Sequence, residues 1–218
     1  MKDIKPDFSY TAHKLITRIS AIYGYAQGLE RGIITPEKAS STIQKECESL
    51  KEELDSMLTA VLLDFQQCQY EPEPVPLIEV MANCIDRSNA MGINKGLTLT
   101  VKQCADEIYV LGNEDLIEDI LDNLFSNVIR YAKTSVFITV RTGGENVLLT
   151  VEDDGPGIHE EDLPYIFDRL YTGPNGNTGL GLYIAHKATL QMGGTLTAAN
   201  RPEGGAIFTL ELKKDSSR

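Results

Sequence analysis

The N-terminal third of the chain carries apolar residues at helical spacing in two successive segments. From Phe8 to Ala26 they recur every three or four residues, which predicts an amphipathic helix. From Ile43 to Phe65 the steps are also mostly three and four, close to a heptad stripe. Between the two segments, Thr35 suits a helix N-cap and Pro36 suits the first helical position. The pattern therefore predicts a hairpin of two helices.

Two helices alone cannot bury two such apolar stripes. A second copy of the hairpin would cover them by completing a four-helix bundle, so we expect a homodimer through the N-terminal helices. The alternative is that the hairpin packs against the rest of its own chain, and the pattern leaves this open.

The remainder of the chain alternates between helical and strand patterns. The stretch EPEPVP, residues 71–76, has prolines at alternate positions and is interpreted as a stiff linker between residues 1–70 and 77–218. Helical patterns follow at 77–91, 116–132 and 180–191. Strand patterns occur at 97–102, 107–112, 135–153 (a hairpin with GGEN at its turn), 193–200 and 204–213. This order predicts an α+β fold, an α/β sandwich with helices on one face of a mixed sheet.

Composition narrows the class of protein. Of 218 residues, 42% are hydrophobic, which is enough for a core, and the net charge of −12 argues against sequence-independent nucleic-acid binding. Four cysteines without CxxC spacing are interpreted as buried thiols in a reducing compartment. No apolar run approaches the ~18 residues of a membrane span. We therefore expect a cytoplasmic location, as a soluble chain or as the inner part of a longer membrane protein.

The predicted helix 116–132 has a polar face as well as an apolar stripe. Asn123, Asn127, Arg130 and Tyr131 are spaced so that they lie on one side of the helix. A carboxamide oxygen suits Mg²⁺, arginine pairs with phosphate, and a tyrosine ring can pack on a base. An ordinary solvated face is the alternative. However, asparagine is a poor helix former, and two of them within one helix lack a local reason.

A glycine-containing turn, VEDDGPGI, follows the strand that ends near Glu152. Gly155 and Gly157 let the backbone bend sharply and approach a ligand closely. Asp153 could accept a hydrogen bond from an exocyclic amine such as that of adenine. Taken alone, Asp-Gly-Pro-Gly is also an ordinary surface turn.

A second glycine-rich stretch, GNTGLGLYIAHK, leads into the last predicted helix. Gly179 and Gly181 lie at its entrance, where free N–H groups and the helix dipole can bind phosphate. The stretch has neither the Gly-Lys-Ser/Thr of a Walker loop nor a strand leading directly into it, as a Rossmann fingerprint would.

Together, these motifs resemble the ATP-binding domain of the sensor histidine kinases, which gyrase, heat-shock chaperone and mismatch-repair ATPases share. NLFSNVIRYA resembles the asparagine box, DDGPGI the first glycine box, IFDRLY the phenylalanine box and NTGLGL the second glycine box. This resemblance covers residues 77–213. The N-terminal hairpin resembles the dimerisation and phosphoacceptor domain of the same kinases.

The resemblance implies ATP and Mg²⁺ as cofactors and assigns their contacts. Asp153 would bind the adenine amine, and Asn127 would hold Mg²⁺. Asn123 and Arg130 would lie near the phosphates, with Tyr131 beside the base. The remaining cofactor-binding residues would come from the two glycine boxes, namely Gly155, Gly157, Thr178, Gly179, Leu180, Gly181 and Leu182.

One position favours a kinase over an ATPase. The related ATPases carry a glutamate where this chain has Asn123, and an asparagine cannot act as the base that activates water. The phosphoryl group would then pass to a protein nucleophile. His13 fits this role because it lies on a small polar face with Thr17, and neutral imidazole is a competent nucleophile. The resemblance implies onward transfer to a response-regulator aspartate, with Thr17 helping to position water for dephosphorylation.

The motif around the histidine departs from the family. The acid that usually follows the histidine is Lys14, which cannot accept its proton, and the usual proline is Arg18, so we expect the helix bend to be lost. Two alternatives therefore stay open. One is a response-regulator phosphatase with weak autokinase activity, and the other is a non-catalytic, nucleotide-binding dimeric module. His159 and His186 are expected to be exposed bystanders.

Overall fold

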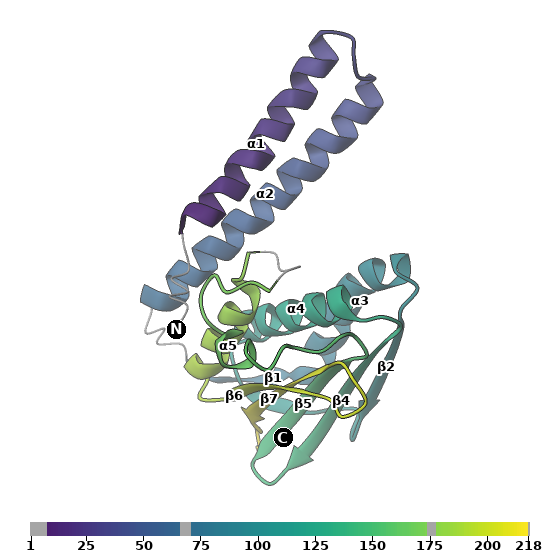
Figure 1. Ribbon diagram of the computed structural model, residues 1–218. Helices are drawn as coiled ribbons and strands as arrows, with labels where there is room; N and C mark the ends of the chain where they lie inside the picture. Colours follow the sequence, from purple (N-terminus) through teal and green to yellow (C-terminus); the bar gives the residue numbers. More distant parts are fainter. Residues whose placement is uncertain (1–7, 66–70, 174–177, 218) are drawn as a thin grey trace.

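The computed structural model describes residues 8–65, 71–173 and 178–217. The side chains of residues 8–13, 64–65 and 89–94 lie outside this description, and His13 is among them. Figure 1 shows a long helical hairpin standing beside a domain of helices on a sheet. The hairpin consists of α1 (Phe8–Glu30) and α2 (Pro36–Phe65). The predicted N-cap is confirmed, because Thr35 Oγ1 accepts a hydrogen bond from the N–H of Lys38 at 3.4 Å.

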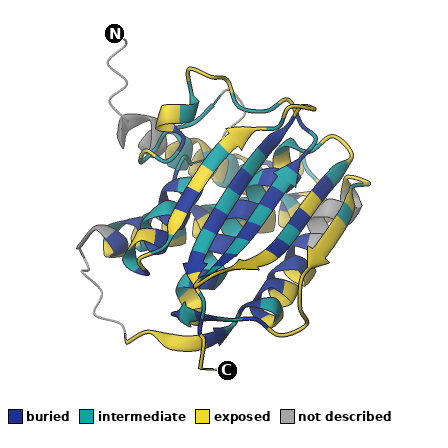
Figure 2. Cartoon of the chain, turned by 90° about the horizontal axis from the view of Figure 1, so that it is seen from below, coloured by how far each residue is buried: buried dark blue, intermediate teal, exposed yellow. Residues whose placement is uncertain are grey.

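The second part of the chain has helices on one face of a mixed sheet, which confirms the predicted fold class (Figure 1). The helices are α3 (Leu77–Asn94), α4 (Glu114–Tyr131) and α5 (Gly181–Gln191), with a short 3₁₀ turn at Leu163–Tyr165. The five-stranded sheet has the order β2 (Thr98–Gln103), β4 (Ser135–Gly143), β5 (Asn146–Asp153), β7 (Ala206–Lys213) and β6 (Thr195–Asn200). Within this sheet, β2 pairs with β4 in parallel and the other neighbouring strands pair antiparallel. Residues of β5 alternate between buried and half-buried, as expected for a sheet covered on one face (Figure 2).

The interpretation of residues 71–76 as only a stiff linker is wrong for most of that stretch. β1 (Glu73–Pro76) pairs antiparallel with β3 (Tyr109–Gly112), and Val75 is buried. Successive N–H groups of a strand point to opposite edges, so prolines at alternate positions remove donors from one edge only. An edge strand tolerates this arrangement, which is why the proline pattern did not prevent pairing.

Two hydrophobic clusters hold the described residues together. The larger lies between the sheet and the helices, and the apolar stripe of α4 supplies much of it, including the fully buried Phe125. The smaller joins the hairpin to the second domain, where Ala60 and Leu63 of α2 pack with Leu180, Tyr183 and Ile184. Among the described residues, the hairpin therefore packs against its own chain through the C-terminal part of α2.

The expectation of buried thiols is wrong for two cysteines. Cys84 is buried, and this burial raises its pKa to about 12, whereas Cys47 and Cys104 are exposed. Cys47 belongs to the α2 stripe, which this chain covers only in part, and Cys104 directly follows the edge strand β2. Cys68 lies outside the described residues. Among the helices that the structure describes, none is long and apolar enough to cross a membrane.

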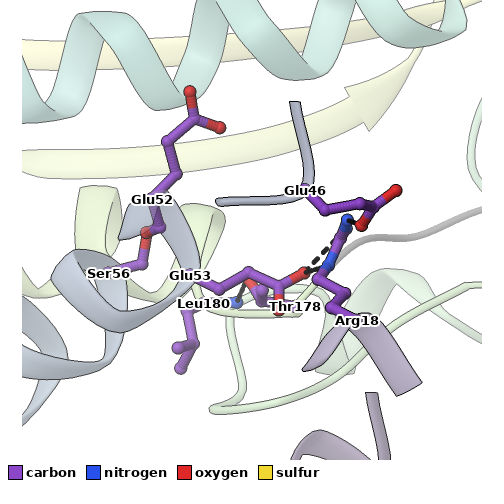
Figure 3. A network of polar contacts seen from close by, with 7 residues as sticks. All are labelled: Arg18, Glu46, Glu52, Glu53, Ser56, Thr178 and Leu180. Carbon is purple, nitrogen blue, oxygen red and sulfur yellow. Dashed lines mark hydrogen bonds and ion pairs between the residues drawn. The ribbon is translucent and has the colours of Figure 1, made fainter. Parts of the chain in front are cut away.

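A three-residue ion-pair cluster links the two helices of the hairpin (Figure 3). α1 continues through Arg18, as expected once the proline is absent. The Arg18 guanidinium contacts Glu46 at 2.9 Å and Glu53 at 3.1 Å, both on α2. Glu53 is only 3% exposed, and its Oε2 has no hydrogen-bond partner among the described residues. The other oxygen, Oε1, contacts Arg18, so the negative charge of this buried carboxylate is balanced by the Arg18 guanidinium.

Candidate functional site

The polar face of α4 meets the start of α5 through Asn123. Its Nδ2 donates to the carbonyl oxygen of Asp119 at 2.7 Å, which fixes the orientation of the amide. Its Oδ1 lies so close to Gly181 that a Cβ at that position would be 2.6 Å away. A side chain at position 181 would therefore require the Asn123 amide to move. The asparagine motif and the second glycine motif, separate in sequence, lie together in the structure.

The other members of this face lie farther along α4. Asn127 is half-buried, and among the described residues its amide has no hydrogen-bond partner. Arg130 is exposed and Tyr131 is half-buried. Lys95 donates from Nζ to the carbonyl oxygens of Ile129 and Arg130, at 3.0 and 2.9 Å, and so caps the helix end with a cation. Sequence reasoning missed Lys95, because no local pattern connects it to α4.

Asp153, the last residue of β5, is oriented by backbone donors on two sides. It is 2% exposed, and its Oδ1 accepts from the N–H groups of Gly155 and Ala206, at 2.8 and 3.4 Å. Burial raises the pKa of this carboxyl, while the two backbone hydrogen bonds oppose that rise. No described residue donates to the other oxygen, Oδ2. One carboxylate oxygen is thus held by the fold and the other remains available to a ligand donor.

The turn after Asp153 is tied to the end of α4. A Cβ on Gly155 would lie 2.3 Å from the carbonyl oxygen of Tyr131, so only glycine fits. Asp154 accepts from the backbone N–H groups of Lys133 and Thr134, at 2.8 and 3.0 Å. Burial opposes ionisation of Asp154, but hydrogen bonds from Thr134 and its neighbours outweigh it and hold the pKa well below its usual range.

The same turn is tied to the end of β6 by Asn200. Its Oδ1 accepts from the N–H of Ile158 and its Nδ2 donates to the carbonyl oxygen of Ile158, both at 2.7 Å. Gly157 has a φ of 78°, and a Cβ there would lie 2.8 Å from Asn200 Oδ1. Sequence reasoning missed Asn200, although a carboxamide can both donate and accept at a strand end.

The second glycine motif contacts the phenylalanine motif. Gly179 has a φ of 69°, and its carbonyl oxygen accepts from the N–H of Leu170 at 2.9 Å. Thr178 Oγ1 accepts from the N–H of Leu180 at 3.3 Å. The side chains of Leu180 and Leu182 pack in the smaller and larger hydrophobic clusters respectively. Leu180 is 1% exposed, so a ligand contact from this residue must come from its backbone.

The three histidines occupy different settings. His159 is exposed, as expected. The expectation of an exposed bystander is wrong for His186, which is half-buried and stacks on Phe167 with ring centroids 4.8 Å apart. Burial and the nearby Lys187 lower the pKa of His186. The backbone of His13 lies in α1, but its side chain lies outside the described residues, so its role stays a prediction.

The residues that flank His13 on α1 are described. Thr17 is exposed one turn after His13, while Lys14 is half-buried. The predicted face of small polar side chains therefore remains accessible at Thr17. The catalytic role of Thr17 also stays a prediction.

The donor set around α4 fits magnesium held mainly by a ligand's phosphates. Among the described residues there is no cluster of three or more His, Cys, Asp or Glu side chains that could hold a metal ion. Mg²⁺ commonly keeps several waters and uses few protein oxygens together with substrate phosphates. The unengaged amide oxygen of Asn127 is a hard ligand of this kind.

Comparison with known proteins agrees with this geometry. Residues 112–216 match the family described as histidine kinase-, DNA gyrase B-, and HSP90-like ATPase. The sensor histidine kinase YcbM of Bacillus subtilis is 28% identical over 216 residues, which are 93% of this chain and 69% of that protein. The Acinetobacter baumannii histidine kinase AdeS has a similar structure, with a TM-score of 0.76, 25% identity, and coverage of 94% of this chain and 98% of that chain. The chain has the catalytic core of a sensor histidine kinase.

The similarity in fold extends over the hairpin as well as the sheet domain. The histidine kinase ThkA, solved in complex with response regulator protein TrrA, has the same fold, with a TM-score of 0.72 at 22% identity over 96% of this chain and 61% of that chain. The chain spans 46% of the length of another curated relative, the histidine-protein kinase BaeS of Escherichia coli. The core is therefore shared with longer proteins.

Proposed function

We propose that this kinase core uses Mg-ATP to phosphorylate His13 and passes the phosphoryl group to an aspartate of a response-regulator receiver domain. In this proposal residues 1–70 are the dimerisation and phosphoacceptor hairpin, and residues 77–218 are the ATP-binding domain. The convergence of three separate motifs carries the proposal. Asn123 lies against Gly181, and the carbonyl of Tyr131 lies against Gly155, so the end of β5 and the start of α5 flank the same helix.

Each part of ATP has a matching group. The free oxygen of Asp153 accepts a hydrogen bond from the 6-amino group of adenine. N–H groups in the first turn of α5 and the Arg130 guanidinium face the phosphates, while Tyr131 packs beside the base. Magnesium bound to the Asn127 amide oxygen would neutralise phosphate charge. The remaining first-box and second-box glycines allow the backbone to approach the nucleotide.

Phosphoryl transfer then proceeds from ATP to imidazole. A ring nitrogen of neutral His13 attacks the γ-phosphorus, and an N–P bond forms as the bond from the γ-phosphorus to the β–γ bridging oxygen breaks. ADP leaves with that oxygen, and the ring proton is lost to solvent. Asn123 cannot activate water as a glutamate would, so hydrolysis of ATP does not compete well.

The second transfer restores the histidine. A carboxylate oxygen of the receiver aspartate attacks the phosphorus, the N–P bond breaks, and the imidazole ring takes a proton back from solvent. ThkA has been solved in complex with a response regulator, and we extend that kind of partner to this chain. In a separate reaction, the exposed Thr17, one turn from His13, would help to position water for hydrolysis of the regulator's aspartyl phosphate. ATP labelled on its γ-phosphorus tests the proposal, with label expected on His13.

We propose further that two chains pair through the hairpin. Large apolar side chains on α1 and α2 are exposed in a single chain, with exposed fractions of 45–64%. They are Ile16, Ile19, Tyr23, Leu54, Leu58 and Leu62. Exposed apolar side chains recurring at helical spacing on both helices indicate an association surface, and a second hairpin would bury them in a four-helix bundle.

Charged substitutions on this face are expected to separate the dimer. In sedimentation equilibrium, the chain should have the mass of two copies, and the double variant Ile19→Glu, Leu58→Glu should have the mass of one. Leu190→Glu is the matched control, because Leu190 is 50% exposed but lies on α5. A dimer that survives the double variant, or one broken equally by Leu190→Glu, would refute pairing through the hairpin.

A further inference from the structure

Arg201 contacts the backbone of the residue proposed to recognise adenine. It follows β6 directly, and its Nη1 donates to the carbonyl oxygen of Asp153 at 2.9 Å. Its Nε contacts Glu152 Oε2 at 3.0 Å, and its Cζ lies 5.4 Å from the centre of the Phe137 ring. The Arg201 side chain is only 18% exposed. It is therefore fixed on three sides and holds one peptide carbonyl.

The carbonyl that Arg201 holds lies where the chain has little freedom. A Cβ on Gly205 would be 1.9 Å from the oxygen of Asp153, so the β6–β7 turn presses directly on this peptide group. The next residue, Ala206, donates its N–H to the Asp153 carboxylate. That turn is itself closed by a hydrogen bond from the N–H of Arg201 to the carbonyl oxygen of Gly205 at 2.9 Å. Arg201 thus connects the turn that orients the carboxylate with the peptide that bears it.

We propose that Arg201 is a positioning residue that sets selectivity for the 6-amino group of adenine by fixing Asp153. This inference rests on the proposed ATP site, and it adds to that site a residue that does not itself touch the nucleotide. Fixing the carbonyl fixes the direction of the Cα–Cβ bond, and hence the line along which Oδ2 meets a donor. The positive charge of Arg201 also opposes the rise in the pKa of Asp153 that burial causes.

The test compares ATP with purine ribonucleoside triphosphate, which lacks only the 6-amino group. Replacing Arg201 with Met should weaken ATP binding roughly 10-fold, because the charge-assisted hydrogen bond that fixes the Asp153 carbonyl is lost. Binding of the purine analogue should change by less than about 2-fold, because no donor meets Asp153 in that complex. The rate of autophosphorylation at saturating ATP should stay near that of the parent protein, so KM changes and kcat does not.

Two matched variants separate positioning from general stability. Arg201→Lys can still donate to the Asp153 carbonyl and should recover most of the ATP affinity. Glu152→Gln weakens the ion pair but leaves the hydrogen bond to Asp153, and should keep ATP affinity within about 2-fold. If Arg201→Met loses affinity for ATP and for the purine analogue equally, the inference is overturned. An Arg201→Lys variant as defective as Arg201→Met would overturn it too.

A wrong role for Arg201 can be distinguished from a wrong assignment of the ATP site. If the parent protein does not prefer ATP to the purine analogue in isothermal titration, the adenine assignment of Asp153 itself is wrong. If the parent protein shows the preference and Arg201→Met retains it in full, only the role of Arg201 is wrong.

Discussion

Replacing Asp153 with Asn should strongly lower the affinity of this kinase core for ATP while leaving the fold in place. Oδ1 of an asparagine can still accept from the N–H groups of Gly155 and Ala206. The amide NH₂, however, would occupy the position of Oδ2 and point a donor at the adenine amine, which is also a donor. An unpaired donor in a buried site typically costs 1–3 kcal/mol, so ATP affinity should fall by roughly 10- to 100-fold.

Isothermal titration measures the expected loss of ATP affinity, and thermal unfolding measures whether the fold is retained. The unfolding midpoint of Asp153→Asn should stay close to that of the parent protein. Asp153→Ala is the contrasting variant, because it removes the acceptor for both backbone N–H groups and should lower the midpoint as well. Unchanged ATP affinity in Asp153→Asn would show that the carboxylate does not contact the nucleotide.

Replacing Arg18 with Met should strongly destabilise the hairpin. The Glu53 carboxylate is 3% exposed, and one of its oxygens already lacks a partner among the described residues. Removing Arg18 leaves this charge uncompensated, and breaking a buried pair in this way costs about 3 kcal/mol. The urea midpoint of unfolding, followed by far-UV circular dichroism at one protein concentration, should fall by roughly 1–2 M.

Two further variants make the Arg18 result specific. Glu46→Gln breaks only the more exposed ion pair and should cost less than about 1 kcal/mol. The double variant Arg18→Met, Glu53→Leu removes both buried charges and should be much more stable than Arg18→Met alone. If the double variant is as unstable as the single one, the buried charge is not the cause. A loss of packing by the arginine stem would then explain the result.

Periodic patterns predicted most of the secondary structure. The α4 stripe and the β4–β5 hairpin follow from local spacing, because burial on one side imposes a period of 3.6 or 2. The Thr35 cap follows from the residue type directly before the helix. Val75 shows the limit of this approach. Its strand has four residues, with prolines at two of them, and its partner β3 lies far along the chain. Pairing of this kind is decided by tertiary contacts that no local pattern records.

The sequence alone suggested the residues that would face a ligand, which stay predictions, but it did not suggest the residues that support them. Motif order brought out Asp153, Asn123 and the glycines, since ligand chemistry restricts which residue types can serve there. Asn200 is an isolated residue outside the motifs, and its hydrogen bond with Ile158 joins residues 42 positions apart. Arg201 and Lys95 likewise act through backbone carbonyls, which accept from almost any donor. Nothing in the sequence around such residues marks the contact, so only the fold reveals them.

The most direct test of the account is phosphorylation of the chain with ATP labelled on its γ-phosphorus, in the presence of magnesium. The account predicts acid-labile, alkali-stable label on the parent protein and none on His13→Ala, provided that His13→Ala still binds ATP with parental affinity. Adding a receiver domain that accepts the phosphoryl group should then remove label from the parent protein. Label that persists on His13→Ala would contradict the account, and so would a parent protein that binds ATP but takes up no label.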